Sequence, residues 1–179
     1  IILKSNAGRS TILDYKNMQG IVTQTLKSLN HDGTPKVYLL HGHMSDSELK
    51  SLYSSEKVKG LVSLTRGEGF GLPMLEAAAC GVPVIATKWS AHTEYMTGDS
   101  YLKIKYNLEK INKSRVDGSL FVEDMRWAEA DEKCAKECLE KIHKYYDVYK
   151  KRAVEHQSFI VENYNFESIS NRYSEHFKD

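Results

Sequence analysis

This sequence of 179 residues contains few cysteines and no long apolar run, and neither sign of charge is in clear excess. Three cysteines cannot all pair within one chain and are too few for a disulfide scaffold, so we expect a reducing, cytoplasmic setting. The 25 lysines and arginines nearly balance the 24 aspartates and glutamates, and the net charge is +1. This balance argues against nucleic acid as a partner, and any anion site must be local.

No apolar run approaches the ~20 residues that span a bilayer, and the first residues lack the features of a signal peptide. The sequence also lacks internal repeats and low-complexity tracts. Its length fits one domain with a substantial core, so we expect residues 1–179 to form a single domain. The chain opens inside an apolar, β-branched segment without a methionine, and we therefore expect a fragment whose preceding domain is missing.

Short apolar runs alternate with longer segments of helical periodicity, which is the pattern of a parallel sheet with crossover helices on both faces. We expect strands at 1–4, 36–41, 60–64, 82–86 and 119–122, and the strand at 60–64 should be buried. We expect helices at 15–29, 45–53, 72–80 and 166–177, and one long helix that begins at residue 131. A polar turn is expected at 30–35, and Ser45 or Asp46 can cap the second helix, with Glu48 completing a capping box. The predicted fold class is α/β, a doubly wound, Rossmann-like parallel sheet with long terminal helices.

The stretch from Ser63 to Ala86 combines a glycine loop with a helix start. Gly67, Gly69 and Gly71 alternate between the carboxyl end of one strand and the beginning of a helix, where glycine permits positive φ and close approach of a ligand. The amides of Gly71 and Leu72 lie at the helix N-terminus, where unpaired donors and the helix dipole favour a phosphate or diphosphate. The sequence therefore predicts a local anion site.

Two carboxylates accompany this predicted anion site. Glu68 lies in the glycine loop, and Glu76 lies about one turn into the helix, so both side chains can face the same crevice. Carboxylates so close to a diphosphate would repel it unless they accept hydrogen bonds from hydroxyl groups. Sugar rings supply such hydroxyls.

Together these residues resemble the Glu-(x)7-Glu signature of the retaining GT-B glycosyltransferases (glycosyltransferase family 4-like, group 1). The form here is Glu68-Gly-Phe-Gly-Leu-Pro-x-Leu-Glu76-Ala-x-x-Cys-Gly-x-Pro-Val-Ile-Ala, and the similarity is dense from Gly60 to Glu94. The resemblance implies the carboxyl-terminal, donor-binding half of a GT-B fold, with the amino-terminal acceptor domain absent. It also implies hexosyl transfer, with retention, from a UDP-, GDP- or ADP-linked sugar to a glycan, lipid or protein acceptor, and weak or no turnover by this half alone.

The resemblance further assigns roles to single residues. It places Glu68 beside the transferred sugar and Glu76 on the nucleotide ribose. It also implies that two basic residues bind the diphosphate, and Lys4 and Arg9 fit the spacing of that pair. Lys16 is an alternative for the second basic position, and Ala91 stands where many relatives have glycine. The expected donor-binding set is Glu76, Gly69, Phe70, Gly71, Leu72, Arg66, Thr65 and His41. No metal or other cofactor is expected, because helix-terminal amides and a basic residue can stabilise the leaving group.

Several other interpretations remain open. His41 and His43, or Cys134 and Cys138, have spacings that can bind a metal, but no further ligands complete either set, and the cysteines fit core packing better. A dinucleotide-binding motif is disfavoured by the glycine spacing. A non-catalytic sugar-nucleotide-binding module and a GT-B-fold nucleotide-sugar epimerase stay as alternative functions, as does peripheral association with a membrane.

Overall fold

The computed structural model describes residues 1–5, 10–29 and 35–177. The chain divides into two compact units, Ile1–Leu49 and Lys50–Asp179. None of the described helices is long and apolar enough to cross a membrane.

The first unit contains two parallel strands, β1 (Ile2–Ser5) and β2 (Tyr38–His41), and helix α1 (Ile12–Ser28) between them in the chain. All three elements were predicted from the sequence. Helix α1 begins earlier than expected because Thr11 and Asp14 form a capping box, in which the Thr11 amide donates to the Asp14 carboxylate at 2.9 Å. The predicted turn at 30–35 lies outside the described residues except at its last position.

Helix α2 (Asp46–Tyr53) begins in the first unit and ends in the second. Its predicted capping box is confirmed. The Ser45 amide donates to Glu48 Oε2 at 2.8 Å, and the Glu48 amide donates to Ser45 Oγ at 3.4 Å. These bonds satisfy two of the amides that a helix start leaves without partners.

A parallel sheet in the order β3-β4-β5 forms the centre of the second unit. Its strands are β3 (Leu61–Ser63), β4 (Val84–Thr87) and β5 (Leu102–Ile104). The central strand β4 is buried along its whole length. The strand expected at 60–64 is confirmed as β3, but it is not buried, since Val62 is 44% exposed. Among the described strands β3 pairs with β4 and lies at the edge of this sheet.

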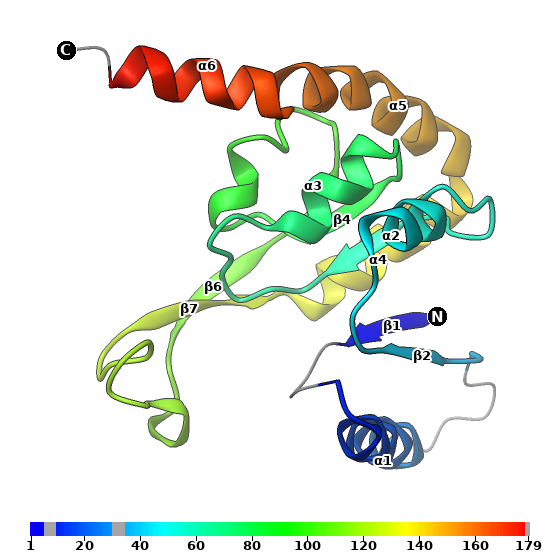
Figure 1. The fold of residues 1–179 in the computed structure, drawn as a ribbon. Coiled ribbons are helices and arrows are strands. Elements are labelled where there is room, and N and C mark those ends of the chain that lie inside the picture. The colour runs from blue at the N-terminus through cyan, green and yellow to red at the C-terminus, as the bar shows by residue number, and fades with distance from the viewer. Residues whose placement is uncertain (6–9, 30–34, 178–179) are drawn as a thin grey trace. The chain divides into compact units, whose positions relative to one another are not determined.

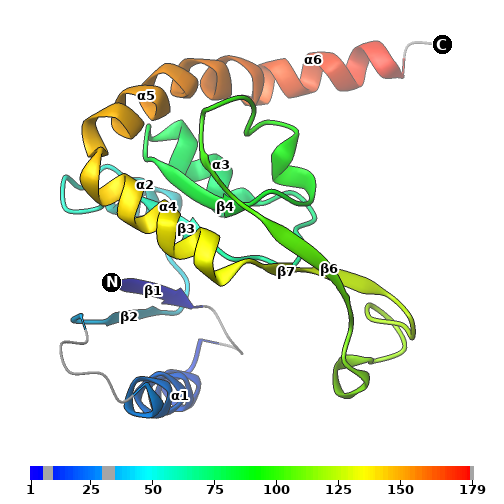
Figure 2. The ribbon, with the colours of Figure 1, turned by 180° about the vertical axis from the view of Figure 1, so that it is seen from behind.

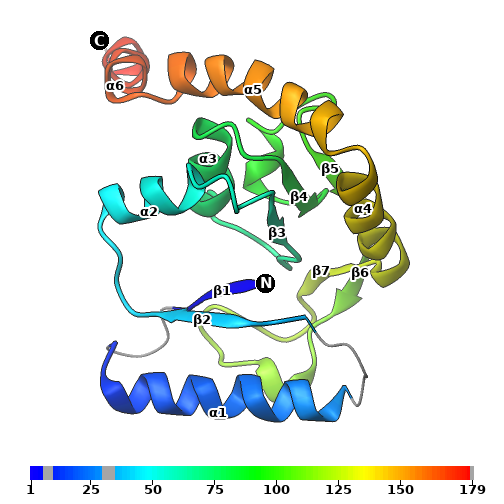
Figure 3. The same cartoon turned by 90° about the vertical axis from the view of Figure 1, so that its right-hand side faces the viewer.

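Helices cover both faces of this sheet, as the sequence predicts. Alternate residues of β4 point to opposite faces. Val84 and Ala86 pack in one cluster with α3 (Leu72–Ala79), and Ile85 packs in a second cluster with α4 (Glu132–Lys144). Figure 3 shows α3 and α4 on the two sides of the strands. The α/β fold class with parallel strands is confirmed.

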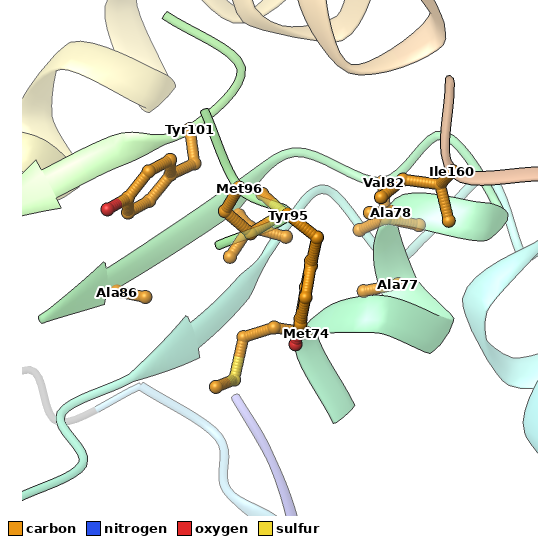
Figure 4. Packing of buried hydrophobic residues seen from close by; sticks show 10 residues of the cluster. Met74, Ala77, Ala78, Val82, Ala86, Tyr95, Met96, Tyr101 and Ile160 are labelled. Carbon is orange, nitrogen blue, oxygen red and sulfur yellow. The ribbon is translucent and has the colours of Figure 1, made fainter. Parts of the chain in front are cut away.

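The larger cluster joins α3 to the segment that follows β4. Figure 4 shows Tyr95 of that segment reaching toward Met74 on α3, and Met96 and Ile160 belong to the same cluster. Met74 and Tyr95 are almost completely buried. This packing fixes the start of α3 against the segment that follows β4.

The long helix expected after residue 131 is two helices, α4 and α5 (Tyr146–Asn163), followed by α6 (Phe166–His176). The helix breaks at Tyr145, whose φ of −124° and ψ of 40° lie outside the helical region. Because of this break α5 can pack on α3, as Figure 1 shows. Lys150 Nζ donates to the Gly81 carbonyl at 2.6 Å and Gln157 Nε2 to the Ala79 carbonyl at 2.7 Å, which satisfies acceptors at the C-terminal end of α3.

An antiparallel hairpin, β6 (Tyr106–Lys110) and β7 (Arg126–Ala130), was not predicted. Figure 2 shows it extending away from the three-stranded sheet. The strand expected at 119–122 is wrong: the Asp117 carboxylate accepts from the amides of Ser119, Leu120 and Phe121 at 2.9 Å each and turns the chain there. Two short 3₁₀ turns complete the unit, at Ala91–Thr93 and Lys113–Arg115.

Candidate functional site

The glycine loop, residues 64–71, connects the carboxyl end of β3 to the start of α3. Gly71, the residue before the helix, has a φ of +88°. A Cβ atom there would lie 2.8 Å from Met74 Cε, 2.9 Å from Tyr95 Oη and 3.0 Å from His92 Cβ. Both the backbone angle and the surrounding atoms therefore require glycine at this position.

The start of α3 presents the amides of Gly71 and Leu72. Pro73 has no N–H group, and the Met74 amide donates to the Gly71 carbonyl at 3.0 Å. In the described part of the chain, the amides of Gly71 and Leu72 at this helix start donate to no acceptor, and the helix dipole adds positive potential around them. Leu72 itself is exposed, and so are Gly69 and Phe70. A helix start of this kind can bind an anion, and the anion site stays a prediction.

Tyr95 holds the backbone of this helix start from the buried side. Its hydroxyl donates to the Gly71 carbonyl at 2.6 Å and lies 3.1 Å from the Phe70 carbonyl. Burial raises the pKa of Tyr95 well above its usual range, and the nearby Glu68 carboxylate raises it further. The hydroxyl therefore remains protonated and keeps its role as a donor at any physiological pH.

The two predicted carboxylates both lie near this tyrosine. Glu68 and Glu76 are both partly buried, and each is close enough to raise the pKa of Tyr95. Burial, followed by the Glu76 carboxylate, also raises the pKa of Tyr53 to about 12. The loop and the first turns of α3 thus bring two acceptor-only groups to the same neighbourhood as the free amides.

Arg66 and Thr65, both expected to bind a ligand, make bonds within the protein. Arg66 forms two hydrogen bonds with Glu129 on β7, at 2.7 and 3.0 Å, and its guanidinium lies 4.5 Å from the Trp127 ring centroid. The Thr65 hydroxyl donates to the Gly67 carbonyl at 2.9 Å and accepts from the Gly67 amide at 3.2 Å. The Thr65 side chain thus bonds within the glycine loop, and the Arg66 side chain joins the loop to β7.

The remaining predicted residues belong to the first unit. Lys4 Nζ donates to the carbonyl of Gly42 and, at 3.3 Å, to that of Ser5. His41 ends β2, and its ring lies 6.1 Å from that of Tyr15. Arg9 lies outside the described residues.

Cys134 and Cys138 serve packing, in agreement with the sequence interpretation. Each thiol lies within 4 Å of the Lys103 carbonyl, and both side chains belong to the cluster around Ile85. Burial, and then the neighbouring Cys134, raise the pKa of Cys138 to about 11. A protonated, buried thiol is a poor metal ligand or nucleophile.

Sequence reasoning missed the contribution of the segment that follows β4, residues 88–96. Ser90 and Tyr95 both bond to the glycine loop, and His92 is fully buried with Nε2 2.8 Å from the Thr87 carbonyl. The sequence offered one signal, the run from Trp89 to Glu94 with Ala91 in place of the usual glycine. It did not indicate which of these side chains turn toward the loop.

Comparison with known proteins places this geometry in a family. Residues 22–144, well over half of the chain, match the family described as glycosyl transferases group 1. One relative is a probable sucrose-phosphate synthase from Thermosipho melanesiensis, 35% identical over 116 residues, an alignment that covers 56% of this chain and 26% of that protein. The chain spans about a quarter of that relative's length. From the extent of the family match, together with the glycine loop and paired carboxylates, we conclude that the chain belongs to the group 1 glycosyl transferases.

Proposed function

We propose that residues 1–179 form the carboxyl-terminal, donor-binding domain of a retaining GT-B glycosyltransferase. In this proposal the domain binds a nucleotide-diphosphate sugar, and an amino-terminal domain supplies the acceptor site for a glycan, lipid or protein. The observation that carries the proposal is the start of α3, where the amides of Gly71 and Leu72 have no acceptor among the described residues and Tyr95, which bonds to the Gly71 carbonyl, lies near both Glu68 and Glu76. Membership of the family supports glycosyl transfer in general.

The amides would stabilise the departing nucleotide diphosphate. Breaking the bond between sugar and phosphate leaves negative charge on the leaving group, and donors already fixed in place oppose this charge without reorganisation. Such donors can do this without a metal ion. Lys4 and Arg9 are proposed to add positive charge, and for Lys4 this would require exchanging its bond to the Gly42 carbonyl for one to phosphate.

The carboxylates would hold the rest of the donor. Glu76 is proposed to accept hydrogen bonds from the ribose hydroxyls, and Glu68 from the hexose, where it can also stabilise positive charge developing at the anomeric carbon. Gly69 and Phe70 would contribute loop backbone, with His41 near the nucleotide. Thr65 and Arg66 would act through the shape of the loop, because their side chains already have partners in the protein.

Calorimetric titration of the chain with UDP-, GDP- and ADP-linked sugars tests the proposal. We expect one donor to bind, and Glu76→Ala to weaken binding by about 1–3 kcal/mol, the usual loss for a hydrogen bond to a charged group. Glu140→Ala, which removes an exposed carboxylate from α4, is the matched control and should leave binding unchanged.

Lys4→Ala is the second variant in this titration. It should weaken binding if the Lys4 side chain reaches the diphosphate, whereas Lys141→Ala on α4 should not. Absence of binding to all donors at millimolar concentration would contradict the proposal for this chain. Conversion of a bound donor without any acceptor would instead favour an epimerase.

A further inference from the structure

Ser90 has a backbone conformation that L-amino acids rarely adopt. Its φ is 89° and its ψ is −171°, a region that is essentially restricted to glycine. A non-glycine residue persists there only when the surrounding structure imposes the conformation. The Ser90 carbonyl accepts from the Thr93 hydroxyl at 2.7 Å and from the Thr93 amide at 3.1 Å, which fixes one side of the residue.

The side chain of Ser90 offers a reason for this conformation. Its hydroxyl accepts from the Glu68 amide at 2.8 Å and donates to the Glu68 carbonyl at 2.7 Å. One hydroxyl thus bonds to both polar groups of a single residue and restrains both of its backbone dihedral angles. The restrained residue is Glu68, whose carboxylate the proposed function assigns to the transferred sugar.

Tyr95 restrains the same loop two residues further on. The peptide group is planar and trans, so an amide points opposite to the carbonyl of the preceding residue. The Tyr95 hydroxyl bonds to the carbonyls of Phe70 and Gly71, and the amides of Gly71 and Leu72 therefore point away from it. The same bonds that hold the loop direct its donors toward the proposed diphosphate.

We propose that Ser90 and Tyr95 are positioning residues, which hold the backbone from Glu68 to Leu72 in its donor-binding conformation before the donor arrives. The inference rests on the function proposed above and concerns the ligand-free state. Affinity for the donor should then depend on these two hydroxyls, although neither need touch the ligand.

Two replacements of Ser90 distinguish an effect on donor affinity from an effect on the stability of the fold. Both Ser90→Gly and Ser90→Ala remove the hydroxyl, but only the glycine variant also removes the backbone strain. We expect both to lower donor affinity by about tenfold, a loss typical of hydrogen bonds removed from a preorganised site. The melting temperature of Ser90→Gly should nevertheless exceed that of Ser90→Ala. Wild-type affinity in Ser90→Gly would overturn the role of the hydroxyl.

Tyr95→Phe tests the second contact, with Tyr101→Phe as its matched control. Both tyrosines are buried, and burial raises the pKa of both, but only Tyr95 bonds to the loop. Tyr95→Phe should weaken donor binding several-fold, and Tyr101→Phe should not. Equal losses in the two variants would mean that general destabilisation explains the effect.

Hydrogen exchange without any ligand tests the inference independently of the proposed function. Ser90→Gly should speed exchange in peptides that cover residues 66–72, while exchange in β4 stays as in the wild type. Unchanged exchange in the loop would overturn the positioning role even if a donor binds. If the loop exchanges faster but no donor binds, the positioning role holds and the proposed function fails.

Discussion

At the scale of single residues, Gly71 is the most constrained position of the glycine loop. It combines a positive φ with neighbours on several sides, whereas Gly67 has neither a positive φ nor an atom within 4 Å of the position that a Cβ would take. The sequence shows three alternating glycines and could not rank them, because the difference arises from Tyr95 and His92, more than 20 positions further along the chain.

Replacing Gly71 with alanine should therefore destabilise the protein. Left-handed strain and the contacts with Tyr95 Oη and His92 Cβ together predict a loss of about 2–4 kcal/mol in the free energy of unfolding. Urea denaturation measures this loss. Gly67→Ala is the control and should change the free energy by less than about 1 kcal/mol; equal losses in the two variants would contradict the structural account.

At the scale of elements, the hairpin β6–β7 contacts the glycine loop at Arg66. The Ala128 amide donates to the Arg66 carbonyl at 3.1 Å, and the Arg66 side chain pairs with Glu129 and lies over Trp127. The side chain of Arg66 is half exposed, so the ion pair by itself contributes little, about 0–1 kcal/mol. Its main effect is to fix geometry.

Charge exchange between Arg66 and Glu129 tests this contact. Arg66→Glu and Glu129→Arg should each lower the free energy of unfolding by about 1 kcal/mol through like-charge repulsion, and Arg66→Glu also loses the cation–π contact with Trp127. The double variant should recover part of the loss. Measuring donor affinity in the same variants shows whether Arg66 also binds the donor. If Arg66 also binds the donor, as the sequence first predicted, the double variant will recover stability without recovering affinity.

Most elements could be predicted from the sequence because their signals are local. Capping residues, the periodicity of 15–29 and the apolar run at 82–86 specify helices and strands without help from distant residues. The hairpin could not be predicted, because its strands pair residues up to 24 positions apart, such as Tyr106 and Ala130, and lack a tight-turn signal between them. The break at Tyr145 was missed for a similar reason: α5 turns there to pack on α3, a tertiary effect.

Only part of the candidate site could likewise be predicted from the sequence. The residues of the glycine loop and the helix start were recognised because they are contiguous. Ser90 and Tyr95 were not recognised, because a hydroxyl that bonds to a distant backbone leaves no periodic pattern in the sequence. The roles of Arg66 and Thr65 were assigned from the motif alone, and their bonds to Glu129 and Gly67 became visible only in the structure.

At the scale of the whole molecule, the buried apolar residues are unevenly distributed. Both hydrophobic clusters consist of residues from Lys50–Asp179, and none of the described residues of Ile1–Leu49 belongs to either cluster. Burial of apolar surface is the main stabilising contribution to folding. Among the described residues, the second unit therefore holds most of the stabilising core.

This distribution predicts unequal opening of the two units. Hydrogen exchange measured by mass spectrometry should give a lower opening free energy for amides of β1 and β2 than for those of the fully buried β4. A donor that binds at Glu76 should slow exchange in α3, because a ligand bound only to the closed form stabilises it by mass action. A Glu76→Ala variant with weakened binding should lose that protection. Equal opening free energies for β1, β2 and β4 in the ligand-free chain would contradict the predicted difference between the units.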